Sequence, residues 1–321
     1  MGAEEVWWPH WSSKPARPAN PRVGGFDSHT LPPSGERPRR HQLLEGLIMK
    51  LPIAALGFVL GSAFFFLAGS VYSQEPSSQS PIFPTPQRLR TLGQQPDDGP
   101  VIMLNLLKFK PDGGRAAYGR YGAIAIQQIR RRGGEILYGG EVAGLLGPGS
   151  EWEQVVIVKY PSRAAFLDMS QDPEYLQALP HRDEGLDATL LYAFRPAEGL
   201  TRLDDDGDVP TVDAAGADAY FNINLLRYKG EEGREAYERY TANTFPLIAE
   251  LGGRPVLRLV GEQPLVGDEG WDELLFIMYP SREAFLGMLQ DPDYREGTPD
   301  RTAGLDNTLF LPTRMTLGGA R

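Results

Sequence analysis

Asn105-Leu-Leu-Lys-Phe-Lys110 returns 119 residues later in the chain as Asn224-Leu-Leu-Arg-Tyr-Lys229. The same spacing relates further identical pairs: Gly133-Gly134 and Gly252-Gly253, Tyr160-Pro-Ser-Arg163 and Tyr279-Pro-Ser-Arg282, Asp172-Pro173 and Asp291-Pro292, and Gly185-Leu-Asp187 and Gly304-Leu-Asp306. Aligned without gaps, residues 101–194 and 220–313 are identical at about a third of their positions, which indicates an internal duplication. The chain therefore contains two copies of one domain.

Each copy has the pattern of a strand, a helix, two strands, a helix and a last strand. The elements expected in the first copy are a strand over 101–109, a helix over 115–132, strands over 135–146 and 152–160, a helix that starts after Ser162 and is interrupted at Asp172-Pro173, and a strand over 189–194. Gly133-Gly134 is typical of a helix C-terminus. The order βαββαβ is that of the ferredoxin-like, split βαβ fold, in the α+β class.

The rest of the chain lacks this pattern. The proline-rich residues 1–47 predict a disordered tail, and residues 74–100, rich in Pro, Ser and Gln, predict a flexible linker. Between the copies, residues 197–218 predict an acidic linker. The expected repeats are then 101–196 and 219–315.

An apolar run precedes the repeats. No charged residue occurs from Leu51 to Gln74, and the run is long enough to cross a bilayer as a helix. Basic residues lie on its N-terminal side, which predicts a cytoplasmic N-terminus and an extracytoplasmic folded part. Residues 49–73 are either a membrane anchor or a signal peptide, so the membrane is a partner, through 51–72, only if this segment is not cleaved. Met49-Lys50 resembles the start of a bacterial signal peptide, and we hypothesise that translation begins at Met49.

The composition excludes several classes of site. The chain has no cysteine, which excludes disulfides, thiolate catalysis and cysteine zinc sites. With 42 acidic residues against 32 Lys and Arg, the net charge of -10 argues against nucleic acid as a partner. No P-loop, dinucleotide glycine motif or Ser-His-Asp set is present in a usable context. His181 is the one histidine after the apolar run, a poor basis for a metal or haem site. We expect no metal and no cofactor, and whether the protein is an enzyme stays open.

The repeated segments together resemble one known family. Asn-Leu-Leu on the first strand, the Gly-Gly pair, Tyr-Pro-Ser-Arg, Asp-Pro-x-Tyr and a late arginine are similar to the domain of unknown function 1330 family, in the dimeric alpha/beta barrel superfamily. The resemblance covers about 101–196 and 220–314. It implies two ferredoxin-like sheets that pair face to face, here as an intrachain pseudo-dimeric alpha/beta barrel in which repeat pairing replaces homodimerisation. The second copy departs from the first at Asp300, which stands in place of His181.

Alternation along the first strand separates two faces. Ile102, Leu104 and Leu106 form an apolar face that we expect to pack on the helices. The opposite face carries Asn105 and should line the space between the sheets. The candidate pocket residues are Asn105, Asn222, Asn224, Trp152, Trp271, Arg182 and Arg301.

Each candidate also has a structural interpretation. An asparagine amide either meets a ligand or is satisfied by the backbone. The tryptophans are pocket walls or core aromatics, and the core is favoured. The arginines serve ion pairs or bind a carboxylate or enolate. Tyr118 and Tyr121, at helical spacing, are interpreted as packing residues.

Three functions fit these features. The first is an extracytoplasmic protein that binds a small apolar or carboxylate ligand in the cavity between the two pseudo-symmetric sheets. The second is a cofactor-independent isomerase or monooxygenase that acts on an enolisable or aromatic substrate. The third is a structural module of the cell envelope.

Overall fold

The computed structural model describes residues 82–97, 99–143, 151–197 and 216–318, and these ranges contain both repeats. The first repeat comprises β1 (Val101–Phe109), α2 (Gly114–Arg131), β2 (Glu135–Val142), β3 (Gln154–Tyr160), α3 (Arg163–Gln171), α4 (Pro173–Gly185) and β4 (Leu186–Pro196). The second comprises β5 (Tyr220–Tyr228), α6 (Gly230–Glu250), β6 (Arg254–Val266), β7 (Glu273–Tyr279), α7 (Arg282–Gln290), α8 (Pro292–Gly304) and β8 (Leu305–Gly318). The predicted βαββαβ order is confirmed in both copies.

Local signals set the helix boundaries. Gly133, with a φ of 72°, follows the end of α2, as the Gly-Gly pair predicts. The Ser162 hydroxyl caps α3 by accepting a hydrogen bond from the Ala165 backbone nitrogen at 3.1 Å. Asp172 ends α3 and caps α4, where its carboxylate accepts from the Glu174 backbone nitrogen at 2.8 Å. The predicted interruption at Asp172-Pro173 is therefore a break between two helices.

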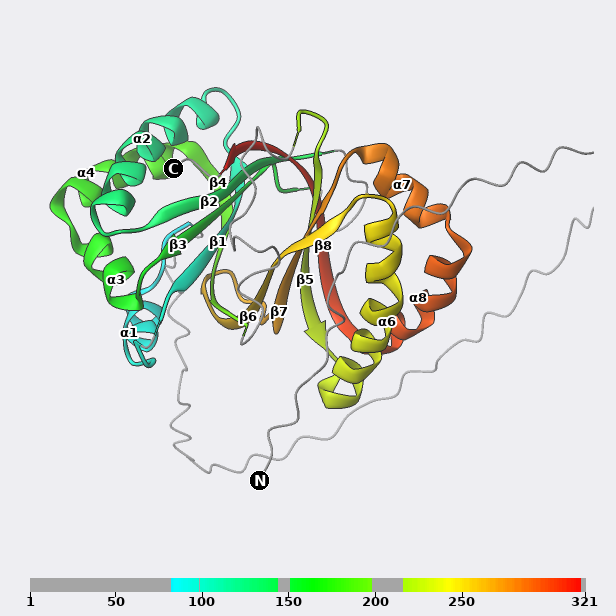
Figure 1. Ribbon diagram of the computed structural model, residues 1–321. Coiled ribbons are helices and arrows are strands. Elements are labelled where there is room, and N and C mark those ends of the chain that lie inside the picture. The colour runs from blue at the N-terminus through cyan, green and yellow to red at the C-terminus, as the bar shows by residue number, and fades with distance from the viewer. Residues whose placement is uncertain (1–81, 98, 144–150, 198–215, 319–321) are drawn as a thin grey trace, which may run out of the picture. The chain divides into compact units, whose positions relative to one another are not determined.

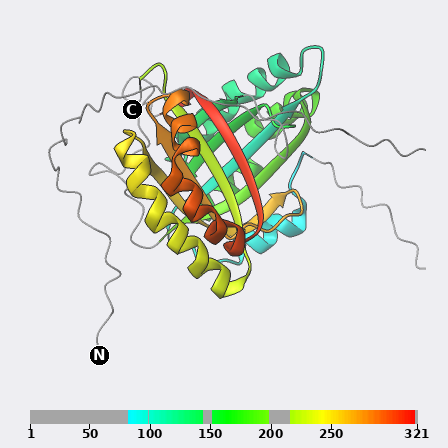
Figure 2. The same ribbon diagram turned by 90° about the vertical axis from the view of Figure 1, so that its right-hand side faces the viewer.

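The eight strands close into one antiparallel barrel. Their order around it is β1-β3-β2-β8-β5-β7-β6-β4, and the helices lie outside the strands (Figure 1). Figure 2 shows α6, α7 and α8 over the strands of the second repeat. The repeats join at two seams, β2 with β8 and β4 with β6, so each copy completes the barrel of the other. A pseudo-dimeric barrel within one chain is what the sequence predicted.

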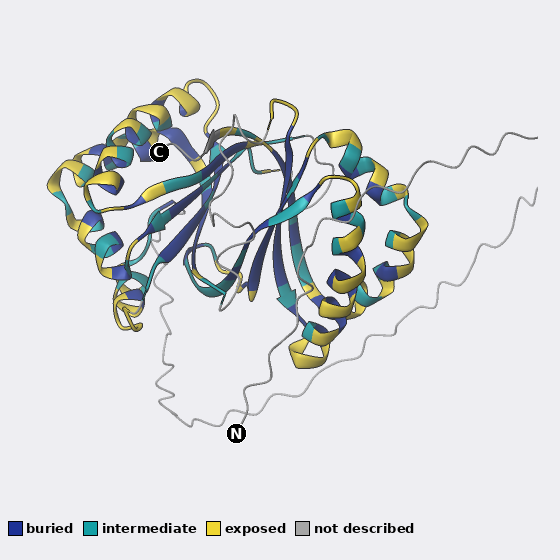
Figure 3. Cartoon of the chain, viewed as in Figure 1, coloured by how far each residue is buried: buried dark blue, intermediate teal, exposed yellow. Residues whose placement is uncertain are grey.

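One large apolar cluster fills the barrel interior. It unites Ile102, Leu104 and Leu106 of β1 with Phe221 and Ile223 of β5 and is buried throughout. The prediction that this face of β1 packs on the helices is therefore wrong. Alternation identifies two faces of a strand but not which one points inward, and here both faces are covered by apolar layers, as the dark strands in Figure 3 show.

The opposite face of β1 carries Met103 and Asn105 and meets the helices. Met103 packs with Ile129 of α2 and Phe166 of α3. The Asn105 face therefore lies under a helix layer and not between the two sheets, which corrects the predicted location of the pocket.

Residues 82–97 are not the flexible linker that the composition predicted. They include helix α1 (Pro86–Gly93), whose first turn is capped by the Thr85 hydroxyl. Leu92 is fully buried in the helix-side core of the first repeat. The Arg88 guanidinium donates to the Gly267 carbonyl at 2.7 Å and pairs with Asp268 of the second repeat. Proline at the start of a helix fixes its first turn, so Pro86 favours a helix here and does not indicate flexibility.

No helix within the described ranges is long and apolar enough to span a membrane. The run from Leu51 to Gln74, the tail over 1–47 and the acidic stretch over 204–208 lie outside those ranges.

Candidate functional site

A cavity of about 790 Å³ lies in the first repeat, between its helices and the outer face of its strands. Its floor includes Met103 and Asn105 of β1 and Val156 and Val158 of β3. Helices α2, α3 and α4 form its walls, and Phe83, Pro84 and Leu89 of the α1 segment contribute to one side. Most of the lining is apolar, and a smaller number of polar side chains face the cavity.

Asn105 offers an amide to this cavity. Its Nδ2 donates two long hydrogen bonds, to the Val156 carbonyl at 3.4 Å and the Met103 carbonyl at 3.5 Å. No described group donates to its Oδ1, and the side chain is only partly buried. The sequence thus identified a cavity residue although it placed the cavity on the wrong side of the strand.

Three tyrosines line one wall. The hydroxyls of Tyr121 on α2 and Tyr175 on α4 share a hydrogen bond of 2.9 Å, and Tyr118 packs against Tyr121 at 5.2 Å between ring centroids. Burial raises the pKa of Tyr118 to about 12 and raises that of Tyr175 well above its usual value. The phenols of Tyr118 and Tyr175 are therefore neutral at physiological pH.

Arg182, on the last turn of α4, lies beneath these rings and lines the cavity. It is 4% exposed, and its guanidinium carbon is 5.3 Å from the Tyr121 ring centroid and 5.9 Å from that of Tyr118. Its Nε donates to the Ile82 carbonyl at 3.3 Å, whereas its buried Nη2 has no hydrogen-bond partner within the described ranges. No carboxylate of the described chain pairs with Arg182. The ion pair that the sequence allowed is absent, and a buried positive charge faces the cavity.

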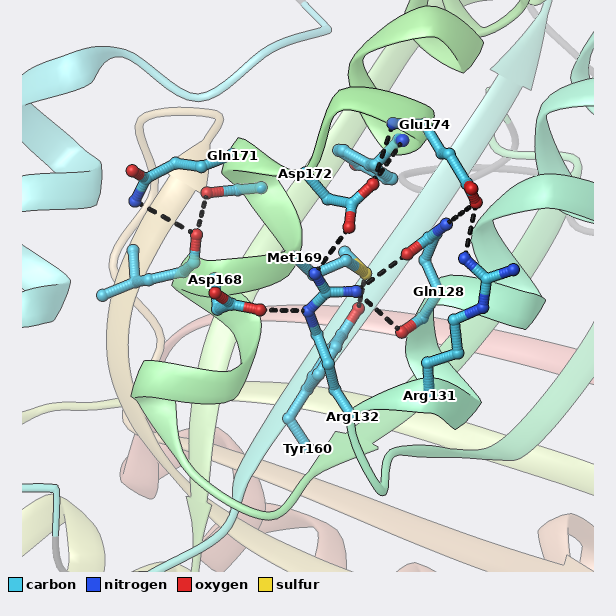
Figure 4. Close-up of polar contacts among 12 residues, drawn as sticks. Gln128, Arg131, Arg132, Tyr160, Asp168, Met169, Gln171, Asp172 and Glu174 are labelled. Carbon is cyan, nitrogen blue, oxygen red and sulfur yellow. Dashed lines mark hydrogen bonds and ion pairs between the residues drawn. The ribbon is translucent and has the colours of Figure 1, made fainter.

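A polar network fixes the corner where α2 meets α3 and α4 (Figure 4). The Arg132 guanidinium lies between the carboxylates of Asp168, at 2.5 Å, and Asp172, at 2.8 Å. It also donates to the Gln128 side-chain oxygen at 2.8 Å, and the Gln128 amide donates to Glu174 at 2.6 Å. These bonds hold the helices that form the cavity walls.

The second repeat carries larger apolar side chains at the equivalent place. Phe245, Leu275 and Phe310 stand where the first repeat has Ile126, Val156 and Leu191. All three belong to or pack against the helix-side apolar cluster of the second repeat. Phe310 stacks on Phe285 at 5.8 Å between ring centroids. The duplicated scaffold has an open pocket in one copy and larger side chains in the other.

The second-repeat candidates lie in this part of the second repeat. The Asn224 amide donates to the Leu275 carbonyl at 3.3 Å, which is the structural interpretation of the asparagine. Asn222 is 1% exposed, and its Oδ1 has no partner. Arg301 is partly exposed and donates to the Thr308 hydroxyl at 3.4 Å.

The tryptophans belong to the barrel interior, as the favoured core interpretation predicted. Trp271 is 5% exposed, and its backbone nitrogen and oxygen both bond to the Tyr192 hydroxyl at 3.0 Å. Trp152 is partly buried against the same cluster. Neither lines the cavity. His181 is on the surface beside Arg120 and Glu184, and the described residues include no group of three or more metal-ligating side chains.

Comparison with known proteins identifies the domain. The family model "Domain of unknown function (DUF1330)" matches residues 113–193 and again 231–313. The chain belongs to the DUF1330 family. No curated protein matches it.

The solved structures that are similar to this DUF1330 chain belong to proteins with different names. A Rhodopseudomonas palustris protein of unknown function is 32% identical over 37% of this chain and 98% of its own, with a TM-score of 0.35. An anthrone oxidase-like protein is 12% identical over 68% of this chain and 92% of its own, with a TM-score of 0.44. A mutant chlorite dismutase from Candidatus Nitrospira defluvii is 9% identical over 70% of this chain and 95% of its own, with a TM-score of 0.40.

Two groups of residues that line the cavity were not predicted from the sequence. Tyr118 and Tyr121 were expected to be packing residues only, yet both line the cavity together with Tyr175. The available signal was their three-residue spacing on the face of α2 that meets α4, the helix that carries Arg182. The contribution of Phe83 was not foreseeable from the predicted linker.

Proposed function

We propose that this DUF1330 chain binds a small, largely apolar molecule in the cavity of its first repeat. The observation that carries the proposal is the cavity itself, whose volume of about 790 Å³ is in the range of small-molecule sites. Apolar walls with a few polar groups, here Asn105, the tyrosines and Arg182, are the usual make-up of such sites. The proposed site differs from the one first expected, which lay between the sheets.

The difference in side-chain size between the two repeats supports ligand binding in the first. A close-packed interior is the default in proteins, and the second repeat shows that this scaffold accommodates larger side chains at the same positions. Ile126 and Leu191 of the first repeat are smaller than Phe245 and Phe310 of the second, so the first repeat lacks the packing energy that the larger side chains supply. A bound molecule in the first copy would supply those contacts instead.

The test is to fill the cavity with the side chains of the second copy. We expect the parent chain to enhance the fluorescence of the neutral apolar probe N-phenylnaphthylamine, and native mass spectrometry to show one bound molecule per chain. The double variant Ile126→Phe/Leu191→Phe should fold and lose this binding. Leu251→Phe, which adds a ring at a partly exposed position of the second repeat, is the matched control.

The outcomes separate the candidate functions. Equal binding by the parent and the filled variant, or no binding by the parent, would reject the proposal. A ligand recovered unchanged after incubation supports binding, whereas its conversion would favour the isomerase or monooxygenase alternative.

A further inference from the structure

The charges that line the cavity do not cancel. Its ionisable side chains other than tyrosines are Arg115, Glu141 and Arg182. Among the lining residues, Arg115 pairs with Glu141 at 3.2 Å, so these two charges balance, and Glu153, which also contacts Arg115, is not part of the lining. Arg182 has no carboxylate partner among the residues that the structure describes. The cavity of an acidic protein with a net charge of -10 therefore carries one excess positive charge.

The acidic side chains nearest to Arg182 in the sequence do not supply the missing charge. Glu184 is exposed and pairs with Arg120 at 2.8 Å. Asp183 is exposed as well, on the outer surface of α4, and its backbone oxygen accepts a hydrogen bond from the Lys110 ammonium. The neighbouring Tyr118 phenol supplies no negative charge either, because burial raises its pKa to about 12. A buried guanidinium whose Nη2 has no hydrogen-bond partner in the described chain carries a desolvation cost, and a ligand or water beside it would offset that cost.

We infer that the cavity takes an apolar molecule with a single carboxylate group and that Arg182 binds this carboxylate. The inference rests on the proposed function and specifies its ligand class. One guanidinium balances one negative charge, which favours a monoanion over a dianionic phosphate. Its planar array of donors matches the two oxygens of a carboxylate. The hydroxyls of Tyr121 and Tyr175 lie on the same wall, and the one that accepts their shared hydrogen bond is available as a further donor.

The second repeat offers a natural comparison. Arg301 occupies the equivalent position on α8, but it is partly exposed, and its Nη2 donates to Thr308. The space beside it contains larger side chains. Arg301 is therefore the matched control for Arg182, with the same residue type and the same place in the fold but with larger apolar side chains in its repeat.

The experiment compares two acids with their uncharged amides: naphthoate with naphthamide, and decanoate with decanamide. Dissociation constants are measured by calorimetry on the full chain. We expect the acid of at least one pair to bind about 10- to 100-fold more tightly than its amide, the range for a hydrogen-bonded charge. Arg182→Gln should abolish this preference, Arg182→Lys should retain most of it, and Arg301→Gln should leave it unchanged.

The controls separate this inference from a purely structural role for Arg182. The Nε bond to Ile82 holds the α1 segment, so Arg182→Gln is expected to lower stability as well, but a structural role would weaken acid and amide equally. Equal affinity of acid and amide in the parent chain, or a preference that persists in a folded Arg182→Gln variant, would overturn the inference while the proposed function stands. If neither the acids, the amides nor the neutral fluorescent probe bind, both are rejected.

Discussion

At the residue scale, Gly185 is required by the close approach of two helices. A Cβ on this residue would lie 2.7 Å from the Tyr118 backbone nitrogen and 2.9 Å from the Gly114 oxygen. We expect Gly185→Ala to lower the free energy of unfolding by about 1–3 kcal/mol, because α4 would have to move away from α2. Urea denaturation measures the change. An unchanged midpoint would show that the helices are not held this closely.

Gly122 on α2 provides the opposite case. A Cβ there would meet no atom within 4 Å, since the residue faces the cavity. We expect Gly122→Ala to raise the free energy of unfolding by about 0.5–1 kcal/mol through helix propensity. The same denaturation experiment checks it. A loss of stability would mean that the space beside Gly122 is smaller than the structure shows.

At the element scale, the ion pair of Arg132 with Asp172 joins the end of α2 to the start of α4. The Arg132 guanidinium, followed by the backbone donors at Tyr175 and Glu174, holds the pKa of Asp172 below its usual value. A carboxyl with a lowered folded-state pKa stabilises the fold above its unfolded-state pKa, and this contribution is lost as the pH falls through the folded-state pKa.

Asp172→Asn tests this joint, because asparagine still caps α4 but has no charge. We expect a lower thermal midpoint for the variant at pH 7 and a difference from the parent that disappears at acid pH. Asp291→Asn is the control, since Leu251 replaces Arg132 in the second repeat and leaves only the cap. A deficit for Asp172→Asn that persists at acid pH, or an equal one for Asp291→Asn, would contradict the role of the pair.

The helices and strands also show which features of the fold could be predicted from the sequence. Asp172-Pro173 and Gly133 are local signals that fix where elements begin and end, and they were interpreted correctly. The orientation of β1 is not local, since Leu104 and Met103 are equally suited to the barrel interior and to the helix layer. Asn105 is expected in the interior from strand alternation alone, whereas the residues of α2 and α4 that line the same cavity come from distant parts of the chain. The cavity could not be predicted, because it depends on what the walls leave unfilled.

At the scale of the whole molecule, the repeats share one core, and Tyr138 shows this most clearly. It belongs to β2 of the first repeat and is fully buried, with ring centroids 4.7 Å from Phe276 and 5.2 Å from Phe221 of the second. Its hydroxyl bonds to that of Thr313 at 2.5 Å across the β2–β8 seam. The duplicated sequence predicted two units, but this packing makes the two units interdependent.

We therefore expect the repeats to unfold together. Tyr138→Phe removes one buried hydrogen bond and should cost about 1 kcal/mol, whereas Tyr138→Ala should cost about 3–5 kcal/mol. Hydrogen exchange read by mass spectrometry should show equal losses of protection in β1 and β5, although only the first repeat is changed. Leu257→Ala, at the equivalent position of the second repeat, should act on both in the same way. Loss of protection confined to the altered repeat would mean that each copy is stable alone, and that barrel closure adds little to the stability of either.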